Sequence, residues 1–365
     1  MLTCDFDFDL PPHLIAQEPS PSKANTKMLV FCQQKIVDAT VKDLVNFLPQ
    51  NCVLVFNDAK VIKAKLTATI ARNQTILNFN LNQQISNDFQ QNSCWTALAK
   101  PLKKVQVGDL LQIGDNFSAT VLAKNSNFLT LQFSCPNDKL LEKLELFGSM
   151  PLPPYIKKTS EHDSQNYQTI YAKNGMAVAA PTAGLHFNQE ILDTLKQKNI
   201  TQTFVTLNVG AGTFLPVKTS KIVDHQMHHE SFVLSQETAD IINLAKKEGR
   251  KIIAVGTTAL RVLEAVANKH GSLQAKSEST DIFIYPPYQF KIVDGLLTNF
   301  HLPKSTLFML ISAFVGKQNA VDIYRHAINH SYRFYSYGDT SLLMGWGKKR
   351  DELLDNRKKL ILPCL

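Results

Sequence analysis

The pattern of hydrophobic and polar positions changes twice along the chain. In residues 1–62, apolar runs at 27–32 and 52–56 predict buried strands, and the pattern at 41–48 predicts a helix. From about residue 63, apolar and polar residues alternate in short segments at 66–70, 76–81, 107–115, 120–123 and 128–133, with polar linkers between them. Many short alternating strands at close spacing predict a small antiparallel β-barrel.

The remainder of the chain predicts helices and strands in turn. A helix at 139–146 ends at Gly148, and the proline-rich segment 150–155 follows it. Further helices are expected at 189–198, 237–248, from 258 onward and at 305–315, with Asn188 and Ser305 as N-caps. Strands are expected at 203–208, 251–255, 281–285 and 291–299. This order is typical of an α/β layer or an irregular barrel.

Together the patterns predict an α/β fold class in which one domain interrupts another. We expect a discontinuous, barrel-like α/β main domain at residues 1–62 and 149–345. A small antiparallel β-barrel domain is inserted at 63–148, and a C-terminal tail is expected at 346–365.

The composition is that of a folded protein with a basic bias. Hydrophobic residues at 44% and charged residues at 19% exclude disorder for most of the 365 residues. The net charge of +8 indicates either an acidic partner such as a nucleic acid or a lysine-rich composition, because 32 residues are Lys and only 7 are Arg. Six widely spaced cysteines, no secretory signal and no apolar run long enough to span a bilayer predict a cytoplasmic protein.

Three turns of small residues lie at 180–184, 209–214 and 255–258, where predicted strands end or helices begin. In open α/β sheets, ligands bind beyond the carboxyl ends of the strands, where backbone N–H groups attract anions and carboxylates. None of the turns has the spacing of a dinucleotide or nucleoside triphosphate loop. Together they indicate a ligand cradle, or each is only a tight connection.

A histidine-rich segment at 224–230 contains Asp224, His225, His228, His229 and Glu230. Histidine titrates near neutral pH and also binds metals, so the segment suits proton transfer or metal binding. If the segment is extended, His228 and Glu230 share a face and form an acid/base pair, whereas His229 points away. The alternative is a polar strand edge with structural histidines.

Two of the rare arginines and one further histidine occur in motifs. Arg261, about one turn into a helix, is placed to bind a carboxylate or phosphate, unless it pairs with Glu264. His301 lies between a strand and a helix, where functional side chains often lie. Arg333 lies among aromatic residues at 332–337, which either stack on a base or pack as an aromatic strand.

Basic residues also alternate near the entrance to the predicted barrel, at Lys60, Lys63 and Lys65. With three further lysines at 100–104, they form either a phosphate-binding patch or a solvated face.

Distinctive motifs follow one another over nearly the whole chain, at 8–11, 54–57, 150–155, 167–171, 179–187, 209–214, 225–230, 254–261, 298–306 and 332–339. In these motifs the chain resembles the S-adenosylmethionine:tRNA ribosyltransferase-isomerase family of queuosine biosynthesis. The resemblance implies an α/β domain interrupted by a β-barrel. It also implies transfer and isomerisation of the ribosyl part of S-adenosylmethionine onto 7-aminomethyl-7-deazaguanine in the tRNA anticodon. Epoxyqueuosine is then the product, and adenine and methionine are released.

The resemblance also implies the partners of the chain. We expect tRNA carrying 7-aminomethyl-7-deazaguanine and S-adenosylmethionine as substrates, and no cofactor beyond S-adenosylmethionine as co-substrate. No metal and no membrane contact are expected. The chain is expected to be a monomer or a weak dimer.

The implied reaction needs a base beside the sulfonium, assistance to adenine loss and anchors for the methionine group. We expect His228 or His301 to be the base, Glu230 to orient it, and His225 to be a further catalytic residue. Arg261 and the turn of Gly210, Gly212 and Thr213 are expected to anchor the carboxylate and ribose. The other expected substrate-binding residues are Thr182, Gly184, His186, Gly256, Thr257, Asn299, Tyr335 and Asp339. The expected tRNA-binding residues are Lys60, Lys63, Lys65 and Arg333.

The chain departs from the family pattern at a few positions. Lysine stands at positions 27, 60 and 65, where the family usually has arginine, and Thr340 and Ser341 stand where it has Ala-Met. Lysine keeps the charge but loses bidentate geometry. Two alternative functions are a non-catalytic RNA-binding protein that binds through the barrel, and a metal-dependent hydrolase that uses Asp224, His225, His228 and Glu230.

Overall fold

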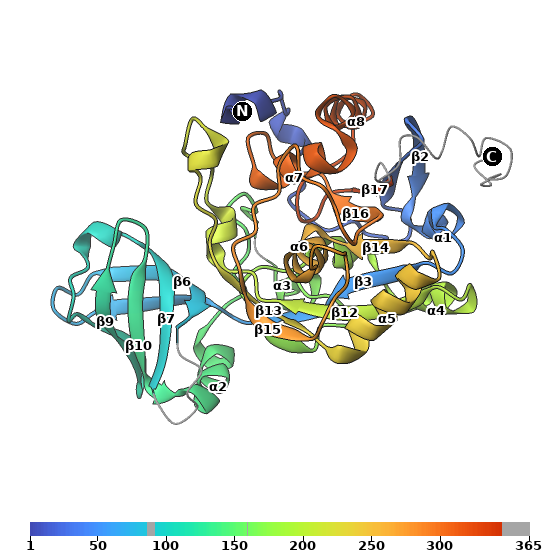
Figure 1. Ribbon diagram of the computed structural model, residues 1–365. Helices are drawn as coiled ribbons and strands as arrows, with labels where there is room; N and C mark the ends of the chain where they lie inside the picture. The colour runs from blue at the N-terminus through green and yellow to red at the C-terminus, as the bar shows by residue number, and fades with distance from the viewer. Residues whose placement is uncertain (86–91, 159, 345–365) are drawn as a thin grey trace, which may run out of the picture.

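The α/β part of the chain is built on one large sheet, shown in Figure 1. The computed structural model describes residues 1–85, 92–158 and 160–344. Nine strands form a mixed sheet in the order β15 (Lys276–Thr280), β13 (Glu230–Leu234), β12 (Thr201–Leu207), β3 (Val53–Asn57), β14 (Ile252–Val255), β16 (Gly295–Asn299), β17 (Thr340–Met344), β1 (Lys27–Cys32) and β2 (Lys35–Thr40). Its two edges are therefore β15 and β2.

Helices cover both faces of this sheet, because successive side chains of a strand point to opposite faces. One face packs against α5 (Gln236–Lys247), α6 (Thr257–Val266), α7 (Thr306–Val315) and α8 (Lys317–Asn329). The other face packs against α1 (Leu44–Phe47) and α4 (Gln189–Gln197). The expected N-caps are confirmed, since the side chains of Asn188 and Ser305 accept hydrogen bonds from the backbone N–H groups of Ile191 and Phe308.

The inserted segment forms a closed barrel, at the left of Figure 1. Its strands are, in order, β10 (Leu129–Pro136), β7 (Asn92–Lys100), β6 (Ile76–Gln84), β5 (Lys65–Ile70), β8 (Leu110–Gly114) and β9 (Phe117–Lys124), and neighbouring strands pair antiparallel. Alternate side chains, including the buried Phe79, Trp95 and Phe133, fill the interior. The expected helix follows as α2 (Asn137–Phe147).

The chain enters and leaves the barrel at neighbouring positions. Backbone N–H and C=O groups of Lys65 and Ser149 pair in both directions, at 3.1 and 2.9 Å. A Cβ atom at Gly148 would lie 2.1 Å from the carbonyl oxygen of Lys63, so this crossing requires a glycine. An α/β domain interrupted by an antiparallel barrel is thereby confirmed, whereas the division at 62/63 and 148/149 stays a prediction.

Short elements complete the described part of the chain. A two-stranded sheet pairs β4 (Ala59–Val61) with β11 (Asn174–Ala177), and α3 (Asp163–Asn166) is a single turn. The 3₁₀ helices are η1 (Thr3–Phe6), η2 (Pro12–Leu14), η3 (Val41–Asp43), η4 (Leu102–Lys104), η5 (Thr182–His186), η6 (Ala211–Phe214) and η7 (Ile222–Asp224). None of the helices in these described ranges has the length and apolar character needed to cross a bilayer.

Some expected elements differ. The strand expected at 281–285 is wrong, because the edge strand is the polar β15 just before it, which hydrophobic alternation does not mark. The strand expected at 291–299 begins only at Gly295, and the helix expected at 41–48 divides into η3 and α1. The tail expected at 346–365 lies outside the described residues.

Candidate active site

The carboxyl ends of four parallel strands lie side by side at one end of the large sheet, between its two edge strands. β12 and β14 each pair in parallel with β3, and β16 pairs in parallel with β14. The segments that follow these strands, at 208–214, 256–258 and 299–301, therefore lie along this end. β17 runs antiparallel to β16, so the loop at 332–339 that precedes β17 reaches the same end. The motifs converge where open sheets bind ligands.

A small cavity lies here between the sheet and the barrel. The Asn82 side-chain oxygen accepts a hydrogen bond from the Gly212 N–H at 2.9 Å, and the Phe128 ring packs edge-on against His228 with ring centroids 5.6 Å apart. The barrel thus supplies part of the cavity wall. The lining residues are Asn82, Gln83, Asn208, Gly210, Gly212, Thr213, His228, His229 and Glu230.

The two glycines of the cavity wall allow close contacts that a side chain would block. A Cβ atom at Gly212 would lie 2.6 Å from Cδ2 of His228, and one at Gly210 would lie 2.6 Å from Oδ1 of Asn82. Both separations are well inside van der Waals contact. The glycine turn therefore brings His228 and the barrel directly onto the backbone.

Arg261 on α6 reaches Glu230 at the start of β13. Its Nη1 donates a hydrogen bond to Oε2 of Glu230, and each side chain is only 8% exposed. The alternative pairing with Glu264 is wrong, because that carboxylate accepts hydrogen bonds from the Tyr288 hydroxyl and the backbone N–H groups of residues 291–293. Arg261 is thus held by Glu230, and Glu230 is itself one of the residues that line the cavity.

Two donors of Arg261 have no protein partner in the described part of the chain. Its Nε and Nη2 atoms are buried and form no hydrogen bond with any residue there. These two N–H groups point to the same side of the guanidinium group, which is the side-on geometry for two parallel hydrogen bonds to a carboxylate. Leaving a buried charged donor unpaired costs upward of about 1–3 kcal/mol. The arrangement indicates an anionic ligand.

The histidine segment differs from its expected conformation. Because β13 begins only at Glu230, the preceding residues are not a strand. His229 is among the residues that line the cavity, and its Nε2 lies 3.7 Å from Oδ2 of Asp281. The carboxylate of Glu230 holds Arg261 rather than orienting a histidine. His225 packs edge-on against Phe283, and burial, followed by the charge of His228, lowers its pKa.

The same segment does not form a metal site. Within the described ranges, the one group of three potential ligands that lie close together is Asp38, His326 and His330. Asp224, His225, His228 and Glu230 are not such a group, and Glu230 is already paired with Arg261. The metal-dependent hydrolase therefore lacks its expected metal centre.

A second group of predicted residues forms a buried network beside α6. Asn299 donates from Nδ2 to Nε2 of His186 at 3.2 Å and to the carbonyl oxygen of Tyr335 at 3.1 Å. The Thr182 hydroxyl lies 3.3 Å from Oδ1 of Asn299. Burial, with the nearby charges of Lys23 and Arg333, lowers the pKa of His186 to about 3. His186 is therefore neutral and accepts a hydrogen bond through Nε2.

Two further predicted glycines, Gly256 and Gly184, lie next to this network. Gly256 has a φ of +91°, a left-handed conformation that favours glycine, and its Cβ position would be 3.6 Å from Ala183 of η5. Thr257 beside it is buried, and so is the hydroxyl of Thr258, which forms no hydrogen bond with the residues that the structure describes. At Gly184, a Cβ atom would lie 2.0 Å from the Tyr171 hydroxyl.

Other predicted residues have partners of their own. His301 Nε2 lies 3.0 Å from the Thr298 hydroxyl, and burial lowers the pKa of His301 to about 3. The Asp339 carboxylate accepts backbone N–H groups of Lys27 and Arg333, at 3.3 and 2.7 Å, and closes the loop before β17. Neither His301 nor Asp339 lines the cavity.

Tyr335 is held in an unusual conformation. Its φ is +75°, and its ring lies against that of Tyr155 with centroids 3.9 Å apart. The Tyr155 hydroxyl is hydrogen-bonded to the Ser336 side chain. A positive φ at a residue with a side chain is strained, and such strain occurs at ligand sites.

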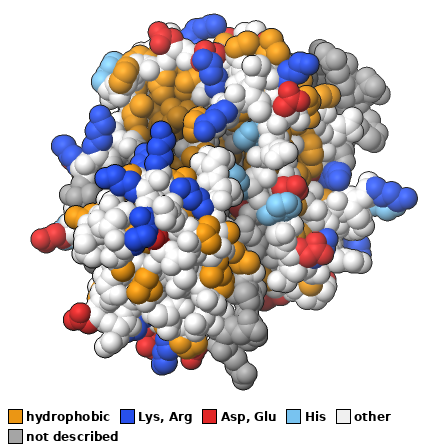
Figure 2. All heavy atoms as spheres, turned by 90° about the vertical axis from the view of Figure 1, so that its left-hand side faces the viewer, with side chains coloured by type: hydrophobic (Ala, Val, Ile, Leu, Met, Phe, Trp, Pro, Cys, Tyr) orange, Lys and Arg blue, Asp and Glu red, His pale blue; other side chains and the backbone are white. Residues whose placement is uncertain are grey.

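The predicted tRNA-binding residues are unequally available. Lys60 and Lys65 are exposed, whereas Lys63 forms an ion pair with Glu145 at 2.9 Å. Arg333 donates to the backbone oxygen of Glu18 at 3.3 Å. Figure 2 shows Lys and Arg side chains gathered on the face that carries the barrel, beside a hollow lined with hydrophobic side chains.

Sequence reasoning missed the barrel's contribution to the cavity. Asn82 and Gln83 begin a polar run at the end of β6, where the pairing with β7 shifts register. In the sequence, the signal for this contribution was the polar run at the end of an alternating strand. A register shift between paired strands often changes the direction of a side chain. Tyr155 lay in the motif at 150–155, but nothing local indicated its contact with Tyr335.

Comparisons with known proteins match nearly the whole chain. A family model described as queuosine biosynthesis protein matches residues 3–343. An S-adenosylmethionine:tRNA ribosyltransferase-isomerase of Treponema denticola is 44% identical and aligns over 94% of this chain and 100% of its own length. A protein of the same name from Ruegeria is 43% identical over 93% of this chain and 99% of its own length.

A solved structure is similar as well. The crystal structure of S-adenosylmethionine tRNA ribosyltransferase from Thermotoga maritima is 31% identical, with a TM-score of 0.53. The similarity covers 93% of this chain and all of that one.

Proposed function

Because the chain belongs to the queuosine biosynthesis family of S-adenosylmethionine:tRNA ribosyltransferase-isomerases, we propose that the cavity beside the barrel carries that reaction. The chain is an enzyme that transfers and isomerises the ribosyl moiety of S-adenosylmethionine onto tRNA in queuosine synthesis. The acceptor we propose is 7-aminomethyl-7-deazaguanine in the anticodon. The proposed product is epoxyqueuosine, with adenine and methionine released.

The buried guanidinium of Arg261 is the observation that carries the proposal. Its Nε and Nη2 donors are unpaired in the described residues, and Glu230 fixes the remaining Nη1. We assign these two donors to the carboxylate of the methionine group. A carboxylate there completes the bidentate pair and removes the penalty of the unpaired donors.

His228 is the base that we propose for removal of the proton beside the sulfonium. It is exposed, lines the cavity and packs on the Gly212 backbone. His301, the other candidate, has its pKa lowered to about 3 by burial, and a base far below the operating pH is a weak one. The turn of Gly210, Gly212 and Thr213 then faces the ribose, and Asn299 with His186 forms the far wall of the substrate site.

The proposal also covers the co-substrate, the tRNA-binding face, the cellular compartment and the oligomeric state. S-adenosylmethionine is the co-substrate, and no other cofactor takes part. tRNA approaches over the basic face that carries the barrel. The residues that we propose for its contacts are Lys60, Lys63, Lys65 and Arg333. The enzyme works in the cytoplasm as a monomer or weak dimer.

One assay tests the activity. The full chain, treated with a chelator and freed of it, is incubated with S-adenosylmethionine and tRNA bearing the precursor base. We expect adenine release in step with appearance of the modified nucleoside by mass spectrometry. Unmodified tRNA is the control and releases no adenine. If adenine stays bound to ribose with correctly modified tRNA, the proposal is wrong.

A pair of variants tests the base. We expect His228→Ala to lower kcat by at least about 100-fold, the size of a lost general base. His301→Ala should lower it far less, because His301 does not line the cavity. If His301→Ala has the larger effect, the assignment to His228 is wrong.

A further inference from the structure

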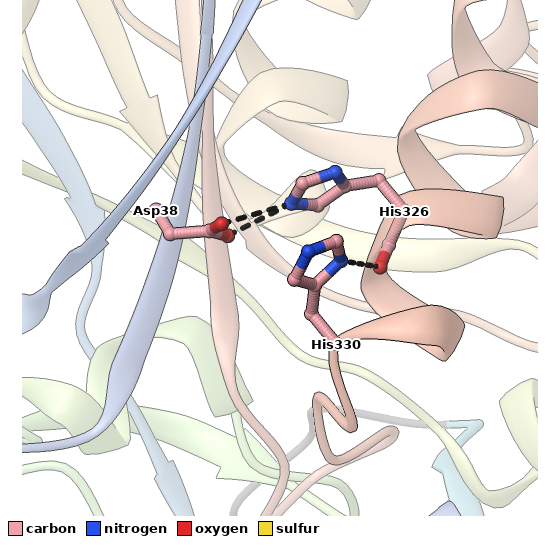
Figure 3. Close-up of side chains that lie close together, drawn as sticks. All are labelled: Asp38, His326 and His330. Carbon is pink, nitrogen blue, oxygen red and sulfur yellow. Dashed lines mark hydrogen bonds and ion pairs between the residues drawn. The ribbon is translucent and has the colours of Figure 1, made fainter.

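A cluster of three side chains lies at β2, the edge strand of the large sheet that is farthest from β15. His326 on α8 and His330 at its end are four residues apart, and Asp38 comes from the edge strand β2 (Figure 3). His326 Nε2 lies 3.0 Å from each carboxylate oxygen of Asp38. The two imidazole rings stack with centroids 3.8 Å apart. One ligand atom from each residue lies within 4.8 Å of the others.

The hydrogen bond of the His330 ring uses Nδ1 and leaves Nε2 as a possible metal ligand. Its Nδ1 lies 2.9 Å from the backbone carbonyl oxygen of His326, and a carbonyl oxygen only accepts, so Nδ1 carries the proton. The Nε2 lone pair of His330 is therefore available. A histidine that donates Nδ1–H to a backbone carbonyl is the usual arrangement of a metal ligand, because it fixes the tautomer and the ring orientation.

Asp38 is oriented in a similar way. The Tyr332 hydroxyl donates a hydrogen bond to Oδ1 of Asp38 at 2.5 Å, and Tyr332 itself is buried. Carboxylate ligands of metals are commonly held by such a second hydrogen bond. The ion pair between Asp38 and His326 does not use the His330 ring, of which one nitrogen lies within 4.8 Å of the ligand atoms of the other two residues.

We propose that Asp38, His326 and His330 bind a divalent transition-metal ion of the zinc class. Two imidazoles and one carboxylate are a ligand set suited to such ions, with a fourth position for water. The 3.0 Å between His326 Nε2 and the carboxylate is shorter than the roughly 3.4 Å between two ligands each about 2.1 Å from one tetrahedral ion, so the two side chains separate slightly when an ion binds. On binding, Nε2 of His326 gives up its proton, and the end of α8 shifts so that Nε2 of the exposed His330 reaches the ion while its Nδ1–H bond is kept.

The position of the site indicates what a bound ion does. It joins the edge strand β2 to the end of α8, directly before the loop at 332–339 that reaches the substrate site. β13, which carries Glu230, lies near the other edge of the sheet. The ion thus has a structural role, in which it holds the edge strand β2 against α8, and it takes no part in the proposed reaction.

Cobalt binding tests the site. The full chain without a polyhistidine tag is titrated with Co²⁺ and followed by visible d–d absorption, and Zn²⁺ is then added as a competitor. We expect one ion per chain, a spectrum of low coordination number and displacement by Zn²⁺. Zn²⁺ should also raise the Tm.

Four variants decide which residues bind the ion. His330→Gln and Asp38→Asn should each weaken Co²⁺ binding by at least about 10-fold, and Tyr332→Phe, which removes only the orienting hydrogen bond, by about 10-fold. His270→Gln, at an exposed histidine elsewhere, should bind like the unaltered chain. His330 and Asp38 are exposed, so their variants are expected to fold, and the Tm without metal checks this. Unchanged binding in His330→Gln and Asp38→Asn, or no binding by the unaltered chain, overturns the proposal.

Discussion

Arg261 shows how a single residue reveals a ligand. A buried guanidinium is costly unless its donors are satisfied, and Glu230 satisfies only one of its nitrogens. The remaining Nε and Nη2 are placed for one planar acceptor with two oxygens. The positive charge of Arg261 therefore serves to bind the ligand, and Glu230 holds the guanidinium group in position between turnovers.

Arg261→Lys tests this role at the substrate site. Lysine keeps the charge but makes no side-on pair, so we expect kcat/KM for S-adenosylmethionine to fall by roughly 10- to 100-fold, mainly through KM. Steady-state kinetics with modified tRNA in excess measure the effect. Arg325→Lys, at an exposed arginine on α8, is the matched control and should be unchanged. An unaltered KM in Arg261→Lys would show that the guanidinium does not bind the substrate.

His186 predicts a dependence of stability on pH. Burial lowers its pKa from 6.5 to about 3, so at intermediate pH the unfolded chain binds a proton that the folded chain does not. Stability is therefore full above about pH 6.5 and falls as the pH drops toward 3, by about 2 kcal/mol at pH 5 from this residue. Urea unfolding at pH 7 and pH 5 measures the loss.

The variant His186→Gln isolates that contribution. Glutamine does not titrate, so the difference in unfolding free energy between pH 7 and pH 5 should shrink by most of that amount. His301, whose pKa is lowered to a similar value, supplies a comparable part that remains. A pH dependence identical to that of the unaltered chain would contradict the buried neutral state of His186.

At the scale of elements, capped and amphipathic segments were predictable from the sequence. Asn188 and Ser305 mark the starts of α4 and α7 in the sequence itself, because the cap lies next to its helix. α8 was not predicted, although its buried Ala320, Ile323, Tyr324 and Ala327 have helical spacing. β15 could not be predicted this way, because it is polar and forms only through pairing with β13.

The site was predictable only in part, because its side chains come from distant parts of the sequence. Motifs showed which turns line the end of the sheet, but not which side chains meet across long sequence separations. Asn82 and Gly212 are 130 residues apart, and Arg261 is 31 residues from Glu230. Such pairs follow from tertiary packing, which no local pattern contains.

The glycine turn after β12 gives a prediction at this scale. A Cβ atom at Gly212 would lie 2.6 Å from the His228 ring, so Gly212→Ala should displace the ring and lower kcat by 10-fold or more, on the order of a misplaced catalytic group. Gly249→Ala is the control, because Gly249 has open space around it but a φ of +74°. It should cost about 1 kcal/mol of stability and leave turnover unchanged. Equal activity of the two variants would contradict the packing of His228 on Gly212.

The molecule as a whole places the substrate cavity at the carboxyl ends of the central strands and the proposed metal site at one edge strand. The parallel strands β12, β3, β14 and β16 direct their carboxyl ends toward the cavity, and the barrel completes that cavity through Asn82. The proposed metal site lies at the edge strand β2. The barrel therefore joins the substrate site to the basic face of Figure 2, where a tRNA substrate can cover both.

The basic face predicts how tRNA binding depends on salt. Lys60 and Lys65 are exposed beside the entrance to the barrel, whereas Lys63 is engaged by Glu145, so we expect the first two to bind phosphates. Removing one lysine–phosphate ion pair should reduce the slope of log K against log salt by roughly 0.7 to 0.9. The double variant Lys60→Gln and Lys65→Gln should therefore bind tRNA several-fold more weakly at low salt, with a smaller slope and an unchanged KM for S-adenosylmethionine. Lys247→Gln, at an exposed lysine on α5, is the control. A salt slope equal to that of the unaltered chain would place the tRNA elsewhere on the molecule.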